Sequence, residues 1–96
     1  MTLAPGDRLE VFHSRSDNSE VIVCRGWLDT DTCGRLQELV DAAVDDRVAR
    51  LRVDLSSLFG VDDAGMRCVL TTSERCRTFG IHLELETNRP IRAALS

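Results

Sequence analysis

Two adjacent carboxylates open the segment Asp62-Asp63-Ala64-Gly65, which directly follows an apolar run. An aspartate at a helix N-terminus accepts hydrogen bonds from backbone N–H groups that have no partner in the first turn. The same turn carries about half a positive charge, so it favours an anion. We therefore expect Asp62 to cap a helix and Asp63 to place its charge in the first turn. Ala64 and Gly65 are small enough to let another chain approach closely.

Acidic residues near strand ends are also typical of a magnesium pocket in which an aspartate is phosphorylated, and Asp54, Asp62 and Asp63 fit that pattern. Such a receiver-type site uses a lysine, whereas all twelve cations of this chain are arginines. His13 and His82 lie on different predicted strands and have no recognisable Ser or Cys nucleophile beside them. We therefore predict no catalytic site, no metal site and no cofactor, and so a protein that is not an enzyme.

Composition indicates a single domain that binds another protein. The chain has 96 residues, 43% of them hydrophobic, and a net charge of -4. This charge argues against nucleic acid and against anionic membrane surfaces, since both attract a dense cationic patch. No signal-like start and no long apolar run is present, so a cytoplasmic protein is expected. The four cysteines form no CxxC pair, which argues against zinc and thioredoxin-like sites.

The periodicity of apolar residues predicts the secondary structure. Alternating apolar residues predict four strands, over 8–13, 20–25, 50–55 and 81–86. Apolar residues at i, i+3, i+4 and i+7 predict two long helices, over 31–46 and 63–78. A third helix begins near Pro90. The predicted order is ββαβαβα, an α/β fold.

The order of elements predicts a two-layer topology. Strand-helix-strand units form right-handed crossovers, so the last three strands should be parallel, with both long helices on one face of a mixed four-stranded sheet. The first strand should run antiparallel, at an edge or beside the second. Loops after parallel strands meet at one rim, where open α/β sheets bind ligands. Asp29 and the Asp62-Asp63 turn should share that rim, with Asp29 or Thr30 capping the first helix.

The second long helix is expected to present one apolar and one outward face. The expected inward residues are Met66, Val69, Leu70, Ser73 and Cys76. The expected outward residues are Arg67, Cys68, Thr71, Arg75 and Thr78. If Cys68 points outward beside the Asp62-Asp63 turn, a redox role is one interpretation, in which Cys68 pairs with a thiol of another chain. Trp27 has two interpretations, packing against the first helix or contact with a partner or second copy.

Three segments, taken in order and spacing, resemble the STAS domain of bacterial anti-sigma-factor antagonists. They are Gly26-Trp27-Leu28-Asp29, Val53-Asp54-Leu55-Ser56 and Val61-Asp62-Asp63-Ala64-Gly65-Met66. The resemblance covers nearly the whole chain. It implies that residues 1–96 form a single STAS domain, whose last helix is cut short.

The resemblance also implies a function. A STAS antagonist binds an anti-sigma factor of the serine-kinase type and so frees a sigma factor for transcription. Its phosphorylated serine follows the aspartate of an Asp-Ser-(Ser/Ala)-Gly-Leu motif, and the matching position here is Asp63. Phosphorylation is therefore not expected at this position. Asp63 carries about one negative charge, against about 1.5 to 2 for phosphoserine. It either locks the domain in a phosphorylated-like state or allows constitutive binding.

The implied partner surface comprises residues at the rim and on the following helix, namely Asp29, Asp62, Asp63, Ala64, Gly65, Arg67 and Cys68. A second function that the family allows is a cytosolic accessory subunit of a lipid-transport ABC system, in which no phosphoserine is needed. An uncovered sheet face or apolar patch would favour a homodimer.

Overall fold

The protein is represented by a computed structural model that describes residues 8–95. Its elements follow the predicted order: β1 (Leu9–Ser16), β2 (Ser19–Leu28), α1 (Cys33–Asp45), β3 (Arg50–Val61), α2 (Asp63–Thr78), β4 (His82–Glu86) and α3 (Arg89–Leu95). The prediction of an α/β fold with the order ββαβαβα is confirmed.

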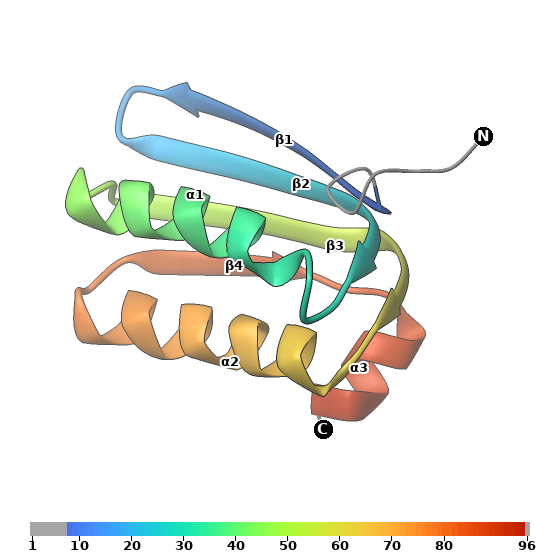
Figure 1. The fold of residues 1–96 in the computed structure, drawn as a ribbon. Helices are drawn as coiled ribbons and strands as arrows, with labels where there is room; N and C mark the ends of the chain where they lie inside the picture. The colour runs from blue at the N-terminus through green and yellow to red at the C-terminus, as the bar shows by residue number, and fades with distance from the viewer. Residues whose placement is uncertain (1–7, 96) are drawn as a thin grey trace.

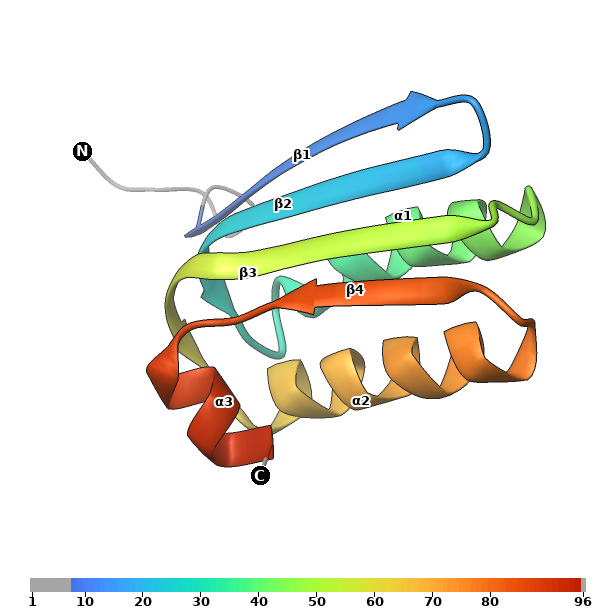
Figure 2. The same cartoon turned by 180° about the vertical axis from the view of Figure 1, so that it is seen from behind.

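The sheet has the strand order β1-β2-β3-β4. β1 is antiparallel to β2, while β2, β3 and β4 are mutually parallel. Both long helices cover one face of this sheet, and the view from behind shows the strands in front of α1 (Figures 1 and 2). The two-layer arrangement with a mixed four-stranded sheet is therefore as predicted, with β1 both at an edge and beside β2.

The first hairpin is longer than predicted. Ser16 pairs with Ser19, so the turn consists of Asp17 and Asn18, with a positive φ of 53° at Asp17. Polar residues had indicated a loop over 14–19. They continue the strands because Glu20, buried at the helix-covered face, accepts a hydrogen bond of 2.9 Å from the Arg15 guanidinium. This ion pair satisfies a carboxylate that would otherwise be costly to bury.

The core is built from aliphatic residues and thiols between the sheet and the two long helices. Its largest fully buried members include Leu9, Ile22, Leu28, Leu36, Leu51 and Leu55. No aromatic side chain belongs to this core, since Phe12, Trp27, Phe59 and Phe79 are all exposed, by 47% to 72%. The aromatic residues of the chain are thus available for surface contacts.

The side of α2 that faces the core agrees only in part with the predicted one: Val69 and Cys76 are buried as expected, and Met66 is partly buried against the core. The buried residues of the helix are Gly65, Cys68, Val69, Thr72 and Cys76. The expectation of an inward Leu70 is wrong, because this side chain is 50% exposed. Thr72 occupies the core without an unpaired hydroxyl, since its Oγ1 donates to the Cys68 carbonyl at 2.9 Å. The helix is turned so that Gly65 faces the sheet.

β3 continues through residues 56–61, beyond the strand that was predicted over 50–55. It pairs with the end of β2 across two register shifts, and Leu28 lies opposite Val61. These irregularities break the strict alternation that identifies a strand. Because of this extension, β3 ends at Val61, directly before Asp62, the residue that precedes α2.

Candidate functional site at the α2 N-terminus

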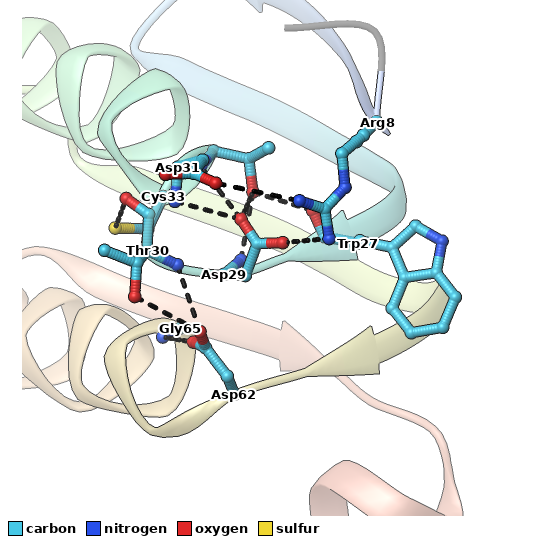
Figure 3. A network of polar contacts seen from close by, with 9 residues as sticks. Arg8, Trp27, Asp29, Thr30, Asp31, Cys33, Asp62 and Gly65 are labelled. Carbon is cyan, nitrogen blue, oxygen red and sulfur yellow. Dashed lines mark hydrogen bonds and ion pairs between the residues drawn. The ribbon is translucent and has the colours of Figure 1, made fainter. Parts of the chain in front are cut away.

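The β2–α1 loop and the β3–α2 turn lie side by side at the carboxyl ends of the parallel strands (Figure 3). The Asp62 backbone N–H donates to the Leu28 carbonyl at 3.2 Å, which ties the two segments together. The prediction that Asp29 and the Asp62-Asp63 turn share one rim is confirmed.

Asp62 caps α2 and fastens the neighbouring loop to it. Its Oδ1 accepts a hydrogen bond of 2.8 Å from the Gly65 N–H, as an N-cap residue does. Its Oδ2 accepts from the backbone N–H and the hydroxyl of Thr30, at 3.1 and 3.2 Å. These donors, the Gly65 N–H foremost, lower the pKa of the Asp62 carboxyl. Asp62 is therefore an ionised bridge between the helix and the loop (Figure 3).

Asp29 organises the β2–α1 loop from within. Its Oδ1 accepts from the backbone N–H groups of Asp31 and Thr32, at 3.0 and 3.1 Å. Its Oδ2 lies 2.5 Å from the Arg8 guanidinium, and only 14% of the side chain is exposed. Both oxygens thus have partners in the same chain. Asp29 positions the rim and offers little free surface to another protein.

The first helix begins later than predicted because of this loop. Asp29 or Thr30 was expected to cap a helix starting at residue 31, whereas α1 starts at Cys33 with Thr32 as its N-cap. The Thr32 hydroxyl donates to the Trp27 carbonyl at 2.7 Å and makes no capping hydrogen bond to the helix. The Asp29 side chain instead closes a turn over residues 29–32.

Asp63 is the free charge of the site. It is exposed in the first turn of α2 and has no hydrogen bond or ion pair with any described residue. Arg67, four residues on, is exposed as well and lies on the same side of the helix. The two residues present a negative and a positive group to a partner. Ala64 between them is half-buried and adds little bulk.

Gly65 packs inside its own chain, which corrects the expectation that it leaves room for another one. It is buried, and a Cβ there would clash with the Leu28 carbonyl oxygen and lie 2.7 Å from Val61 Cγ2. Any larger residue would push α2 away from the end of β2. Gly65 therefore sets how closely the capped helix approaches the β2–α1 loop.

Cys68 is buried, so its predicted outward orientation is wrong. Only 6% of the residue is exposed, and its Sγ lies 3.7 Å from the Cys33 carbonyl oxygen, facing α1. Burial raises the pKa of the thiol to about 11. A thiol that is neither exposed nor ionised reacts slowly, which removes Cys68 from the partner surface.

A hollow of about 330 Å³ lies beside the turn, between the end of β3, the start of α2 and α3. Asp62 and Asp63 line it together with Phe59, Met66 and Ile91, among others. Its lining thus combines carboxylates with apolar side chains, which suits a side chain with an aliphatic stem and a cationic end.

Two features are absent from the described residues. Within residues 8–95, no group of three or more His, Cys, Asp or Glu side chains is placed to hold a metal ion. In the same part of the chain, no helix has the length and apolarity that crossing a membrane requires.

The family model described as Mlab, STAS domain, matches residues 11–95, almost the whole chain. The chain belongs to the STAS domain family. The resemblance inferred from the three sequence segments is thereby confirmed. No curated protein sequence matches the chain.

Solved structures share this STAS fold. An anti-sigma factor antagonist from Mycobacterium paratuberculosis aligns with a TM-score of 0.77 at 20% identity, covering 91% of this chain and 74% of the other. The anti-sigma factor antagonist SpoIIAA in its unphosphorylated form gives 0.75 at 16% identity, with 88% and 80% covered. The phosphorylated form of SpoIIAA, a Bacillus cell fate determinant, gives 0.75 at 15%, with 90% and 79% covered. At these identities the likeness is one of fold.

Two contributors to this STAS rim had not been predicted from the sequence. Thr30 ties the loop to Asp62, and Arg8 neutralises Asp29. Both contacts join residues more than 20 positions apart, so only the fold brings them together. The cap at Asp62, in contrast, is a local interaction and was predictable from the residue type.

Proposed function

We propose that this STAS domain is an anti-sigma-factor antagonist in the cytoplasm, binding a kinase-type anti-sigma factor independently of phosphorylation. The observation that supports it best is Asp63, an exposed carboxylate without a partner among the described residues, at the position where the family resemblance places a serine. The proposed role is stoichiometric binding, with no catalysis by this chain.

Asp63 favours constitutive binding over a locked-off state because its side chain is smaller and carries less charge than a phosphoserine. Its carboxylate carries about one negative charge, on a shorter arm than a phosphoserine with a charge of about -1.5 to -2. The first turn of α2 stabilises this charge through the helix dipole. The partner therefore meets a smaller and weaker anion than a phosphoserine, which, as the family resemblance implies, abolishes binding of the anti-sigma factor. A cationic side chain of the partner can pair with it above the hollow beside Met66.

The remaining rim residues have structural roles in this proposal. Asp62 and Asp29 hold the two loops in a fixed arrangement through contacts within the chain. A preformed surface loses little conformational freedom when it binds, which increases affinity. The proposed contact residues are therefore Asp63, Ala64 and Arg67, supported by Asp29, Asp62 and Gly65.

The proposal is tested by measuring calorimetric binding to each kinase-type anti-sigma factor encoded in the same genome. Wild type, Asp63→Ser and Asp63→Arg are compared with and without ATP. Asp45→Arg is the matched control, because Asp45 is also exposed but lies at the far end of α1. We expect wild type and Asp45→Arg to bind equally with or without ATP, and Asp63→Arg to bind at least about tenfold more weakly.

The serine variant separates the possible outcomes. If Asp63→Ser binds without ATP and loses binding with ATP, the site is a phosphoswitch in which Asp63 replaces the regulated residue. If only Asp63→Ser binds, the domain is locked off and constitutive binding is refuted. If no variant binds any of these anti-sigma factors, the anti-sigma function itself is refuted.

A second candidate function is an accessory subunit of a lipid-transport ABC system. The observation that favours it is the matching family model, which is described as Mlab, STAS domain. This role needs no phosphorylated serine, so Asp63 is no obstacle to it. Co-purification of the chain with an ABC ATPase from the native host, unaffected by Asp63→Ser, would support this function over the first.

A further inference from the structure

One face of the sheet is covered by no described helix (Figure 2). We call this side of the sheet the open face. Three of the four aromatic residues of the chain, Phe12, Trp27 and Phe59, lie on strands of this sheet and are exposed. Trp27 lies between buried Gly26 and Leu28, and Phe59 follows buried Leu58, so both point to the open face. Phe12 points there as well, because it pairs with Val23, whose neighbours in β2 are both buried. The exposed fractions of Phe12, Trp27 and Phe59 are 53%, 47% and 72%.

The rings of Trp27 and Phe59 contact each other, and the Trp27 ring also contacts the backbone of β3. The centroids of Trp27 and Phe59 lie 6.5 Å apart with their planes tilted by 53°, a typical aromatic pair. The Trp27 indole lies where a Cβ of Gly60 would be, so the ring rests on the backbone of β3. Figure 3 shows the indole pointing away from the polar rim. Trp27 therefore does not pack against the first helix, as one interpretation of the sequence had it.

A hollow of about 380 Å³ lies next to Phe59, lined also by Phe12, Val23, Arg25 and Ser57. Phe59 projects from its border as the most exposed large hydrophobic residue of the described chain. One patch thus contains both a projecting ring and a hollow wide enough to receive one. This combination is self-complementary, which is the requirement for an interface between two identical chains related by a two-fold axis.

Charge on the open face also suits a second copy. The whole chain has a net charge of -4. The outward positions of the four strands, in contrast, carry nearly balanced charges: Arg25, Arg50 and Arg52 against Glu10, Asp54, Glu84 and Glu86. Two open faces can therefore meet with little net repulsion, which would not hold for surfaces that share the overall negative charge.

The size of the face approaches what a dimer needs. At about 150–250 Å² per aromatic side chain, the three rings leave roughly 350 Å² exposed, within the range of patches that are often functional. The strands have 8, 10, 12 and 5 residues, so at about 3.3 Å per residue and about 4.8 Å between strands they span roughly 550 Å² before side-chain relief is added. A standard interface buries about 800 Å² per partner.

From these features we infer that the open face is a homodimer interface, in which two copies pack sheet against sheet around Phe12, Trp27 and Phe59. Phe59 also lines the hollow beside Asp63, so this interface borders the proposed partner site, whereas Asp63 and Arg67 themselves lie on α2 and outside the open face. The inference goes beyond the proposed function and does not depend on it.

Sedimentation velocity of the full chain between about 1 and about 200 µM tests the dimer, since this range covers micromolar dissociation constants. Trp27 is the only tryptophan, so its emission reports on this face alone. We expect a dimer whose Trp27 emission shifts to the red on dilution. Phe59→Ser should raise the dissociation constant at least about thirtyfold.

Phe79→Ser is the matched control, because Phe79 is 61% exposed at the end of α2 and away from the open face. It should leave dimerisation unchanged, and circular dichroism confirms that both variants are folded. A monomer over the whole range, or a dimer unaffected by Phe59→Ser, would overturn the inference. Deleting residues 1–7 gives a further test. If the Trp27 emission of the monomer then shifts to the red, the open face is covered by the chain's own N-terminal segment, and the dimer inference is overturned.

Discussion

Replacing Gly65 by alanine tests the close approach of α2 to the end of β2. The added methyl would clash with the Leu28 carbonyl oxygen and lie 2.7 Å from Val61 Cγ2. Backbone cannot move aside as a flexible side chain does, so the cost of overpacking lies near the upper end of its range, about 3 kcal/mol. Alanine regains about 1 kcal/mol of helix propensity. The net loss of unfolding free energy is about 2 kcal/mol.

For a domain of this size, that loss lowers the melting temperature by about 8–16 °C. The measurement is thermal unfolding of both proteins by circular dichroism, supported by urea titration. Gly34→Ala is the control, because a Cβ at Gly34 meets nothing within 4 Å. Because this site is exposed and lies in α1, Gly34→Ala should raise the unfolding free energy by up to about 1 kcal/mol. A Gly65→Ala protein as stable as wild type would refute the assigned role of Gly65.

Three further predictions concern charge, thiols and core. Folding lowers the pKa of Asp62, so this carboxylate stabilises the fold at pH values above its pKa in the unfolded chain, about 4. This stabilisation is lost as the pH falls through the pKa of the folded protein. The difference in unfolding free energy between wild type and Asp62→Asn should therefore stay constant above about pH 5 and shrink below about pH 4. A constant difference at all pH values would contradict this. Half-buried Cys33 should be the first cysteine to react with a disulfide reagent. The other thiols should react more slowly, since burial raises the pKa of Cys24 to about 12 and that of Cys68 to about 11. If Cys33→Ser still contains a thiol that reacts as fast, the prediction is wrong. Leu51→Ala should cost about 2–5 kcal/mol in urea unfolding because Leu51 is fully buried, and a loss below about 1 kcal/mol would contradict the core packing.

Features of the site that depend on neighbouring residues were predictable from the sequence. The Asp62 cap follows from an aspartate before an apolar helical pattern, and its hydrogen bond to Gly65 spans three residues. The end of α2 at Phe79, followed by Gly80 with a φ of 69°, follows from the tolerance of glycine for that conformation. Each depends on a backbone preference that is already present in a short segment.

The side of α2 that faces the core could not be read from the pattern. Residues 66, 69, 70 and 73 have the same helical spacing as residues 65, 68, 69 and 72, so both sets predict a buried stripe equally well. The choice is made by Gly65, which alone allows contact with the Leu28 carbonyl. This choice buries Cys68 and exposes Leu70.

The sequence by itself determined the order of elements, the STAS family and the presence of a charged helix start at Asp62 and Asp63, because periodicity, capping and short motifs are local. Only the tertiary structure decided which carboxylates remain free. Asp29 and Asp62 are occupied by Arg8, Thr30 and backbone donors, whereas Asp63 has no such partner among the described residues. Three identical side chains thus acquired different roles, because hydrogen-bond partners distant in sequence reach two of them and not the third.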